Sequence, residues 1–221
     1  MVSREHIQKI IEDSINKCFT TFYYVTHDGK RISIHVREVK KPVTFVKHLH
    51  NARQTIPTKD RWRVLEPSRE KAETKYLNTR MFVTRHGSTI AIDENNTIIS
   101  VCSYKDKNGK SYDNAGALMS FAVNMGGDKL DTFDGNYTFY RYLGFEPVSW
   151  IKFDDFDTSN IPEWVNGHNR NPELFTKEDI IFFKYTGKQS QYLTSNQFTM
   201  SVDNVDGVDA YEQAAQIRDE Y

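Results

Sequence analysis

Side chains that could act as nucleophiles or metal ligands form no recognisable catalytic or metal-binding pattern in this sequence. Cys102 lies in an apolar stretch, and a reactive thiolate there would need an activating base, which the neighbouring sequence does not supply. His48 and His50 lie close to Lys47, but no second group of Cys, His or carboxylate follows at the spacing of metal ligands. A phosphate loop of the Gly-Lys-Ser type, a dinucleotide fingerprint and a nucleophile elbow are also missing. The sequence therefore predicts a buried thiol and no metal site.

The composition is that of a globular protein large enough for one sizeable core. Its 221 residues carry a net charge of −1, and 38% of them are hydrophobic. No apolar run approaches the roughly 20 residues that span a bilayer. The two cysteines, Cys18 and Cys102, lie far apart in apolar stretches, which suits buried thiols in a reducing compartment better than a disulfide scaffold. We therefore expect a cytoplasmic protein with no membrane association.

Charge is spread unevenly along the chain. Residues 1–80 hold 17 Lys and Arg against 9 Asp and Glu, residues 81–187 hold 10 against 15, and residues 188–221 hold 2 against 6. The basic first segment invites nucleic acid or an acidic protein as a partner. Its basic residues alternate with acidic and aliphatic ones, so a solvated face is the preferred interpretation. Nucleic-acid binding through residues 37–80 therefore ranks last among the functions considered.

Residues 1–80 have the pattern of a helix followed by a hairpin and further helices. Ser3 can cap a helix whose apolar residues recur at three- and four-residue steps as far as Phe22. Alternating residues then flank an Asp28-Gly29 pair, which is typical of a hairpin turn. The remaining elements expected here are strands at 22–25 and 32–36 and helices at 43–52 and 68–77. We expect this basic segment to pack on the core that follows.

The pattern of residues 81–187 predicts the core of the protein, and that of residues 188–221 predicts an acidic tail. Glycine pairs and Asp/Asn clusters separate short β-branched runs, which predicts an antiparallel meander followed by alternating helices and strands. The expected elements are strands at 81–83, 89–92 and 98–104, a helix at 115–125, a strand at 130–133, an aromatic helix, strands at 148–153 and 179–185, an insertion loop at 154–177 and a terminal helix at 209–221. The sequence thus predicts an α/β (α+β) protein with a mixed, mostly antiparallel sheet flanked by helices.

This order of elements resembles that of the GNAT superfamily of N-acetyltransferases. The run Phe139-Tyr140-Arg141-Tyr142-Leu143-Gly144-Phe145-Glu146-Pro147 is similar to the segment that closes the acetyl-CoA site of that family. The hairpin at residues 91–101 looks like its central strands. The resemblance covers about residues 80–187.

The resemblance implies a role for several residues. Tyr140 would be the general acid that protonates the leaving coenzyme A thiolate, although packing onto the sheet is the alternative. The edge of the strand at 99–104, with Val101, Cys102 and Ser103, would pair with the pantetheine amides. The general base would be Asp134, chosen over Asp93, Glu94 and Asp131, although an Asp before Gly is also ordinary turn chemistry.

The family's pyrophosphate loop corresponds to residues 111–117, where this sequence departs from the family pattern. Here the loop would use Asn114, Ala115, Gly116 and Ala117. Tyr112 replaces the basic or amide residue at its start, Ala115 replaces the first glycine, and Asp113 adds a negative charge beside the phosphates. Asn136 would contact the coenzyme or, as preferred, serve the turn or cap the aromatic helix.

Two functions follow as expectations. The first is transfer of an acetyl group from acetyl-CoA to an amine of a protein or small molecule. The alternative is a catalytically inactive GNAT-like binding protein, such as a bacteriophage-encoded inhibitor or modulator of a host protein or other host macromolecule. The departures at residues 111–117 and the uneven charge favour the alternative, and Tyr140 in its motif favours the enzyme.

Overall fold

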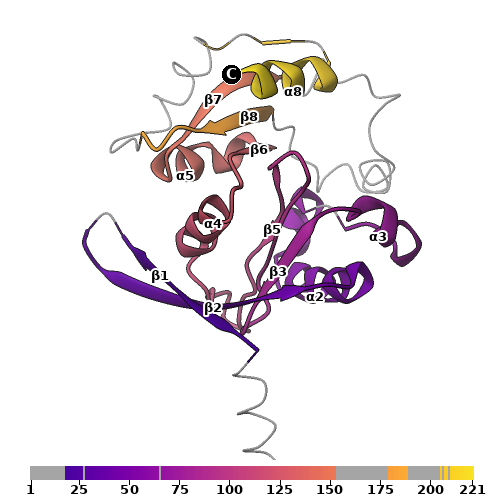
Figure 1. The fold of residues 1–221 in the computed structure, drawn as a ribbon, viewed down its shortest axis with the longest axis vertical. Coiled ribbons are helices and arrows are strands. Elements are labelled where there is room, and N and C mark those ends of the chain that lie inside the picture. Colours follow the sequence, from indigo (N-terminus) through magenta and orange to yellow (C-terminus); the bar gives the residue numbers. More distant parts are fainter. Residues whose placement is uncertain are drawn as a thin grey trace, which may run out of the picture. The chain divides into compact units, whose positions relative to one another are not determined.

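The computed structural model describes residues 18–26, 28–64, 66–152, 179–188, 205, 207–208 and 210–221. Across these residues the protein is mixed α+β, with a five-stranded antiparallel sheet, a three-stranded antiparallel sheet and five α-helices (Figure 1). The predicted fold class is confirmed. The expected insertion loop at 154–177, and residues 3–17 of the expected first helix, lie outside the described residues. None of the helices in the described part has the length and apolar character that a membrane crossing requires.

The five-stranded sheet is built from consecutive strands. Its order is β1 (Thr20–Val25), β2 (Arg31–Val39), β3 (Arg80–Thr84), β4 (Thr89–Ile92) and β5 (Ile98–Cys102). Gly29, with a φ of 78°, closes the predicted first hairpin, because a left-handed residue suits the turn. β4 is buried at every position, so helices or loops must cover both faces of the sheet centre. β5 ends at Cys102, two residues earlier than predicted.

Three helices accompany this sheet: α2 (Pro42–Gln54), α3 (Arg69–Lys75) and α4 (Ala115–Asn124); a 3-10 helix, η1 (Thr58–Arg63), lies between α2 and α3 in sequence. Phe45 of α2 meets Tyr76, which follows α3, with ring centroids 5.0 Å apart. Phe121 of α4 contacts Phe22 of β1 and Phe82 of β3 at 5.5 and 5.0 Å. Aromatic pairs therefore join α2 to α3 and α4 to the sheet.

The three-stranded sheet has the order β6-β8-β7, with β6 (Lys129–Phe133), β8 (Ile180–Tyr185) and β7 (Phe145–Ile151). β8, the last in sequence of the described strands, lies between the two others and pairs antiparallel with both. The strand, helix and strand predicted around the aromatic run are present as β6, α5 (Tyr137–Tyr142) and β7. β6 and β7 do not pair with each other, which the local sequence pattern did not indicate.

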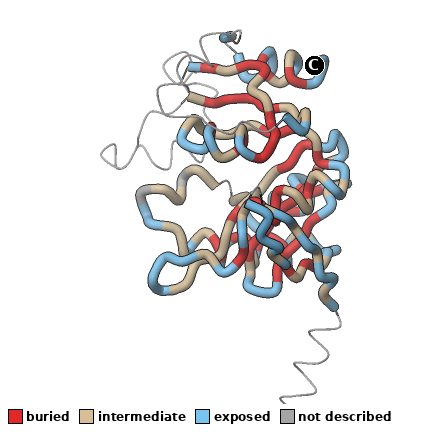
Figure 2. Tube along the Cα trace, turned by 90° about the vertical axis from the view of Figure 1, so that its left-hand side faces the viewer, coloured by how far each residue is buried: buried red, intermediate tan, exposed pale blue. Residues whose placement is uncertain are grey.

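Helices cover both faces of β8. Phe183 packs against Tyr137 and Tyr140 of α5, with ring centroids 5.8 Å away in each case. Phe182, on the opposite face, contacts Tyr211 of α8 (Tyr211–Glu220) at 5.0 Å. Because successive strand residues point to opposite faces, the apolar run of β8 packs against α5 on one side and α8 on the other. Figure 2 marks the buried positions of the chain in red.

The chain forms two compact units. The first unit comprises the described parts of residues 1–56, 66–91 and 100–122, and the second comprises those of 57–65, 92–99 and 123–221. Most of the five-stranded sheet and helices α2, α3 and α4 belong to the first unit. The three-stranded sheet, α5 and α8 belong to the second.

Candidate functional site

The first group of predicted site residues lies on β5 of the first unit. β5 is the last strand of its sheet, so one of its edges has no ladder partner within that sheet. Ser100 has a φ of 55°, which is unusual for a residue other than glycine and interrupts the extended backbone. Val101 and Ser103 are half-buried, and Cys102 is buried. This strand edge therefore offers backbone N–H and C=O groups to a ligand that hydrogen-bonds like a strand.

Cys102 is a structural thiol. It is only 2% exposed, and burial raises the pKa of its thiol to about 12, against the weaker opposing influence of Arg53 and Lys105. A thiol in this state is protonated at neutral pH and is a poor nucleophile. The prediction for Cys102 is confirmed. The prediction for Cys18 is wrong, because that residue is exposed just before β1; no disulfide joins the two.

The second group lies at the start of α4, where the pyrophosphate loop was expected. The Asn114 side chain accepts a hydrogen bond from the Ala117 N–H at 2.9 Å, which is the bond of a helix N-cap. Gly116 and Ala117 are buried. Of the N–H groups in the first turn, that of Ala117 is therefore already used by the protein itself. Asn114, Ala115, Gly116 and Ala117 lie together, as predicted.

Asp113 points into the protein. It is 4% exposed, and its carboxylate accepts hydrogen bonds from the Thr84 hydroxyl at 2.6 Å and the Ser88 hydroxyl at 2.7 Å. His86 Nδ1 lies 3.0 Å from the other carboxylate oxygen. Asp113 thus fastens the segment before α4 to the turn between β3 and β4. No local pattern indicates these partners, because they lie 25 to 29 residues away along the chain.

Tyr140 lies in the core of the second unit. Its ring contacts Phe139, Phe145 and Phe183, and it is 7% exposed. Burial raises the pKa of Tyr140, and the negative charge of Asp131 adds to this, while a hydrogen bond with Thr132 acts in the opposite direction. The phenol therefore keeps its proton at neutral pH, as a proton donor must, but it gives up that proton less readily than an exposed tyrosine.

Asn136 and Thr132 connect this buried phenol with the surface. Asn136 is exposed at the N-cap position of α5, but its side chain makes no capping bond. Instead its amide donates to the Thr132 hydroxyl at 3.0 Å, and Thr132 in turn hydrogen-bonds Tyr140. The expected side-chain cap is therefore wrong, and Asn136 serves the corner between β6 and α5. Two polar side chains lead from Tyr140 to solvent.

The four carboxylates considered as bases have different surroundings. Asp93 accepts from the backbone N–H groups of Asn95 and Thr97 at 2.9 and 2.8 Å, which confirms its role as a turn residue, and Glu94 is exposed in the same turn. Asp134 is half-buried in a 3-10 turn, η2 (Asp134–Asn136), between β6 and α5. Asp131 lies 3.6 Å from the Arg218 guanidinium of α8. Asp131 is thus engaged by a cation, whereas Asp134 lies at the corner between β6 and α5.

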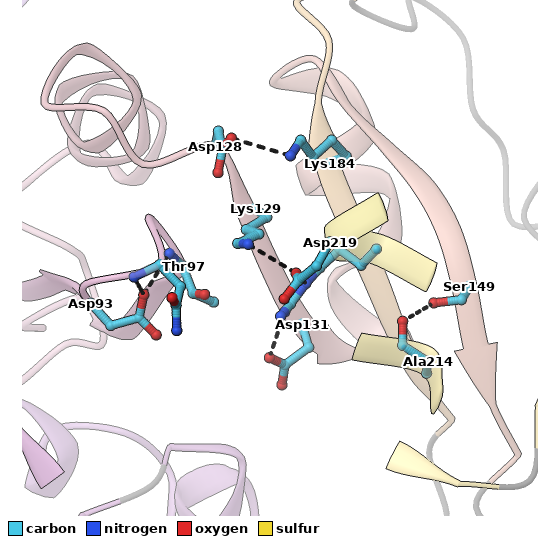
Figure 3. A network of polar contacts seen from close by, with 11 residues as sticks. Asp93, Thr97, Asp128, Lys129, Asp131, Ser149, Lys184, Ala214 and Asp219 are labelled. Atoms are coloured by element: carbon cyan, nitrogen blue, oxygen red, sulfur yellow. Dashed lines mark hydrogen bonds and ion pairs between the residues drawn. The ribbon is translucent and has the colours of Figure 1, made fainter. Parts of the chain in front are cut away.

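Ion pairs that the sequence did not reveal join β6 to α8 and β8 (Figure 3). Lys129, although only 8% exposed, meets Asp219 at 2.9 Å, and Arg218 donates to the same carboxylate at 2.9 Å. Lys184 of β8 pairs with Asp128 at 3.2 Å. Partial burial tends to raise the pKa of Asp219, but the hydrogen bonds from Lys129 and Arg218 outweigh it, so the net shift is downward. This network fixes α8 beside the strand that leads to Asp134.

Thr97 lies just before β5, and Lys129 is the first residue of β6. They form a single parallel bridge, and the Asp128 N–H donates to the Asn96 carbonyl at 3.0 Å beside it. Among the described residues, no group of three or more His, Cys, Asp or Glu could hold a metal ion.

No protein-family model, curated protein or solved structure matches the chain.

Proposed function

We propose that the protein transfers an acetyl group from acetyl-CoA to an amine of a protein or a small molecule. The observation that carries the proposal is the path of the chain in the first unit, where the sheet edge at β5 leads through one loop to the start of α4. In the GNAT family, which residues 80–187 resemble, the pantetheine amides pair with such an edge. The pyrophosphate then lies at the N-terminus of the helix that follows.

The edge of β5 suits an amide-bearing ligand. Pantetheine contains two amide groups in an extended chain, and these can pair with backbone groups as an added strand does. Residues 101–103 would supply the pairing groups. The helix start suits an anion because its first N–H groups and its dipole both favour negative charge. Ala115 and Gly116 would supply them, since Asn114 occupies the N–H of Ala117.

The proposed reaction needs one proton donor and one proton acceptor. The amine nitrogen attacks the thioester carbonyl carbon, the C–S bond breaks, and the sulfur leaves as a thiolate. Tyr140 would donate its phenolic proton to that sulfur, while Asp134 would accept the proton that the nitrogen loses. Tyr140 would then be reprotonated from solvent through Thr132 and Asn136. Positioned proton transfer of this kind contributes on the order of 10²–10⁴ in rate.

The test combines binding with turnover. Calorimetry with acetyl-CoA measures binding, and mass spectrometry follows the coenzyme A released in the presence of lysine peptides and polyamines. Replacing Tyr140 with Phe should lower kcat by about 10²–10⁴ and leave acetyl-CoA binding unchanged. Tyr137→Phe is the matched control, because Tyr137 is also buried and lies on the same helix. If acetyl-CoA does not bind at millimolar concentration, the proposal is wrong.

A second candidate function is that of a catalytically inactive binding protein. It is supported by the cap that Asn114 places on Ala117 and by Asp113 in the preceding loop, since both make the helix start less suited to a pyrophosphate. Such a protein would act by binding a host macromolecule. In that case acetyl-CoA would not bind, and a host partner captured from a bacterial lysate would be lost when basic residues of segment 30–80 are reversed in charge. Unchanged capture by the reversed variants would count against it.

A further inference from the structure

Three aromatic rings lie close together on the surface of the first unit. The rings of His86 and Tyr112 are stacked, with centroids 5.2 Å apart and planes inclined by 17°. Tyr104 follows at 6.4 Å from Tyr112, with a tilt of 30°. Tyr112 is 57% exposed, and the His86 side chain is 45% exposed. The exposed faces of such rings present planar surface on which another planar ring can stack.

The residues beneath the rings hold them in place. Buried Asp113 bonds His86 Nδ1, and because a carboxylate only accepts, this nitrogen carries the hydrogen. At Gly87, whose φ is 106°, a Cβ would lie 3.2 Å from the Tyr104 ring, so only glycine lets that ring pack against the turn. The stack is therefore formed before any ligand arrives, which lowers the entropic cost of binding.

Two of the rings, Tyr104 and Tyr112, flank a basic hairpin. Residues 105 and 111 pair as a β-bridge, and the turn between them contains Lys107 and Lys110, both exposed. The one acidic residue of that turn, Asp106, accepts from the backbone N–H groups of Asn108 and Lys110 at 2.8 and 2.9 Å. Together with Lys105, the hairpin offers cations beside the rings, while its carboxylate is held by its own backbone. The surface thus suits a ligand that is both planar and negatively charged.

We propose that the surface formed by His86, Tyr104, Tyr112 and lysines 105, 107 and 110 binds a nucleotide, with the base stacked on the rings and the phosphates beside the lysines. A mononucleotide fits better than a nucleic-acid strand. Strand-binding proteins have several stacking positions along an extended basic groove, whereas here one ring cluster and one short hairpin supply all the groups. The nucleotide can be free or part of a larger coenzyme, and the inference does not depend on acyl transfer.

The test measures ADP binding by calorimetry at low salt, with coenzyme A, inorganic pyrophosphate and single-stranded oligo(dT) as further titrants. ADP should bind more tightly than pyrophosphate. Tyr112→Ala should weaken ADP binding by about 10- to 100-fold, which is the usual effect of losing one stacking ring, and Tyr112→Phe should keep it. Tyr23→Ala is the matched control, because Tyr23 is 55% exposed on β1 and should have no effect. Lys107→Ala and Lys110→Ala should each reduce the salt dependence of ADP binding, and Lys47→Ala should not.

Several results would overturn the inference. They are the absence of ADP binding at millimolar concentration, equal affinity for ADP and pyrophosphate, no effect of Tyr112→Ala, or oligo(dT) binding that is stronger than ADP binding. Binding of coenzyme A but not ADP would also overturn it, because the nucleotide would then contribute too little on its own. The proposed acyl transfer is tested separately: ADP binding without acetyl-CoA binding would refute that function and support the nucleotide surface.

Discussion

The buried carboxylate of Asp113 allows a stability prediction with a defined magnitude. The hydroxyl of Thr84 accepts from the Ser88 N–H at 2.9 Å, and the hydroxyl of Ser88 accepts from the Tyr104 N–H at 2.9 Å. Both hydroxyls then donate to Asp113. Thr84 is 2% exposed and Ser88 is fully buried, so neither can replace this acceptor with bulk water. Two chains of hydrogen bonds therefore end on one carboxylate.

Replacing Asp113 with Ala should destabilise the protein strongly. Each buried hydroxyl left without its acceptor costs about 1–3 kcal/mol, so the two together cost about 2–6 kcal/mol. Asp113→Asn should recover most of this loss, because the amide oxygen can accept from both hydroxyls. Its NH₂ group would then face His86, whose ring must present a lone pair at Nδ1 and move its hydrogen to Nε2.

Urea unfolding gives the change in free energy, and nitrogen NMR of His86 identifies which ring nitrogen carries the hydrogen. Amide exchange at Ser88 and Tyr104 should also accelerate in Asp113→Ala. Glu73→Ala, which removes an exposed carboxylate on α3, is the control and should change stability little. The reasoning is refuted if Asp113→Ala costs less than about 1 kcal/mol, or if the hydrogen of His86 is on Nε2 in the unmodified protein.

Three further predictions concern other parts of the chain. A thiol reagent at pH 8 should modify exposed Cys18 and leave Cys102 unreacted until the protein is unfolded, as mass spectrometry would show; reaction of both thiols in the folded protein would contradict the burial of Cys102. Gly144→Ala should cost about 1–3 kcal/mol in thermal or urea unfolding, because φ is 93° and a Cβ would lie 3.2 Å from the Gly187 backbone; an unchanged midpoint would contradict this. The pKa of Asp219 is lowered in the folded state, so its contribution to stability should be present above pH 3.8 and lost as the pH falls further. Asp219→Asn should therefore reduce stability near neutral pH and weaken its acid dependence, and parallel pH curves for variant and parent would refute the role of the ion pairs.

Local patterns in the sequence were enough to predict most of the elements. The hairpin at Gly29, the strands at 81–83 and 89–92, and the terminal helix all depend on neighbouring residues, and the structure contains each of them. β5 ends early because the Tyr104 N–H leaves the ladder to bond Ser88, 16 residues away. That contact follows from the course of the chain and has no local signal.

The sequence positions of the candidate site residues could be predicted, but most of their contacts could not. Asn114 to Ala117 start a helix as expected, but the direction of Asp113 depends on hydroxyls far away in sequence. The depth of Tyr140 could not be predicted either, because Phe183, one of the rings that bury it, comes from the last strand. Likewise the helical pattern at the C-terminus predicted α8 but not the pairing of Arg218 and Asp219 with β6. In each case the missing information was the tertiary neighbour.

The central place of β8 affects the order in which the second unit can form during synthesis. β6 and β7 leave the ribosome first, yet each has its antiparallel partner only in residues 180–185. Until that strand emerges, β6 and β7 lack their ladder partner and the inner face of α5 has no sheet to cover, so the edges of both strands are open to pairing with other chains. The ladders also join residues 29 to 55 positions apart, so their closure is slow compared with that of the local β1–β2 hairpin. Nascent chains that stop before residue 180 are therefore the species that a chaperone would need to protect.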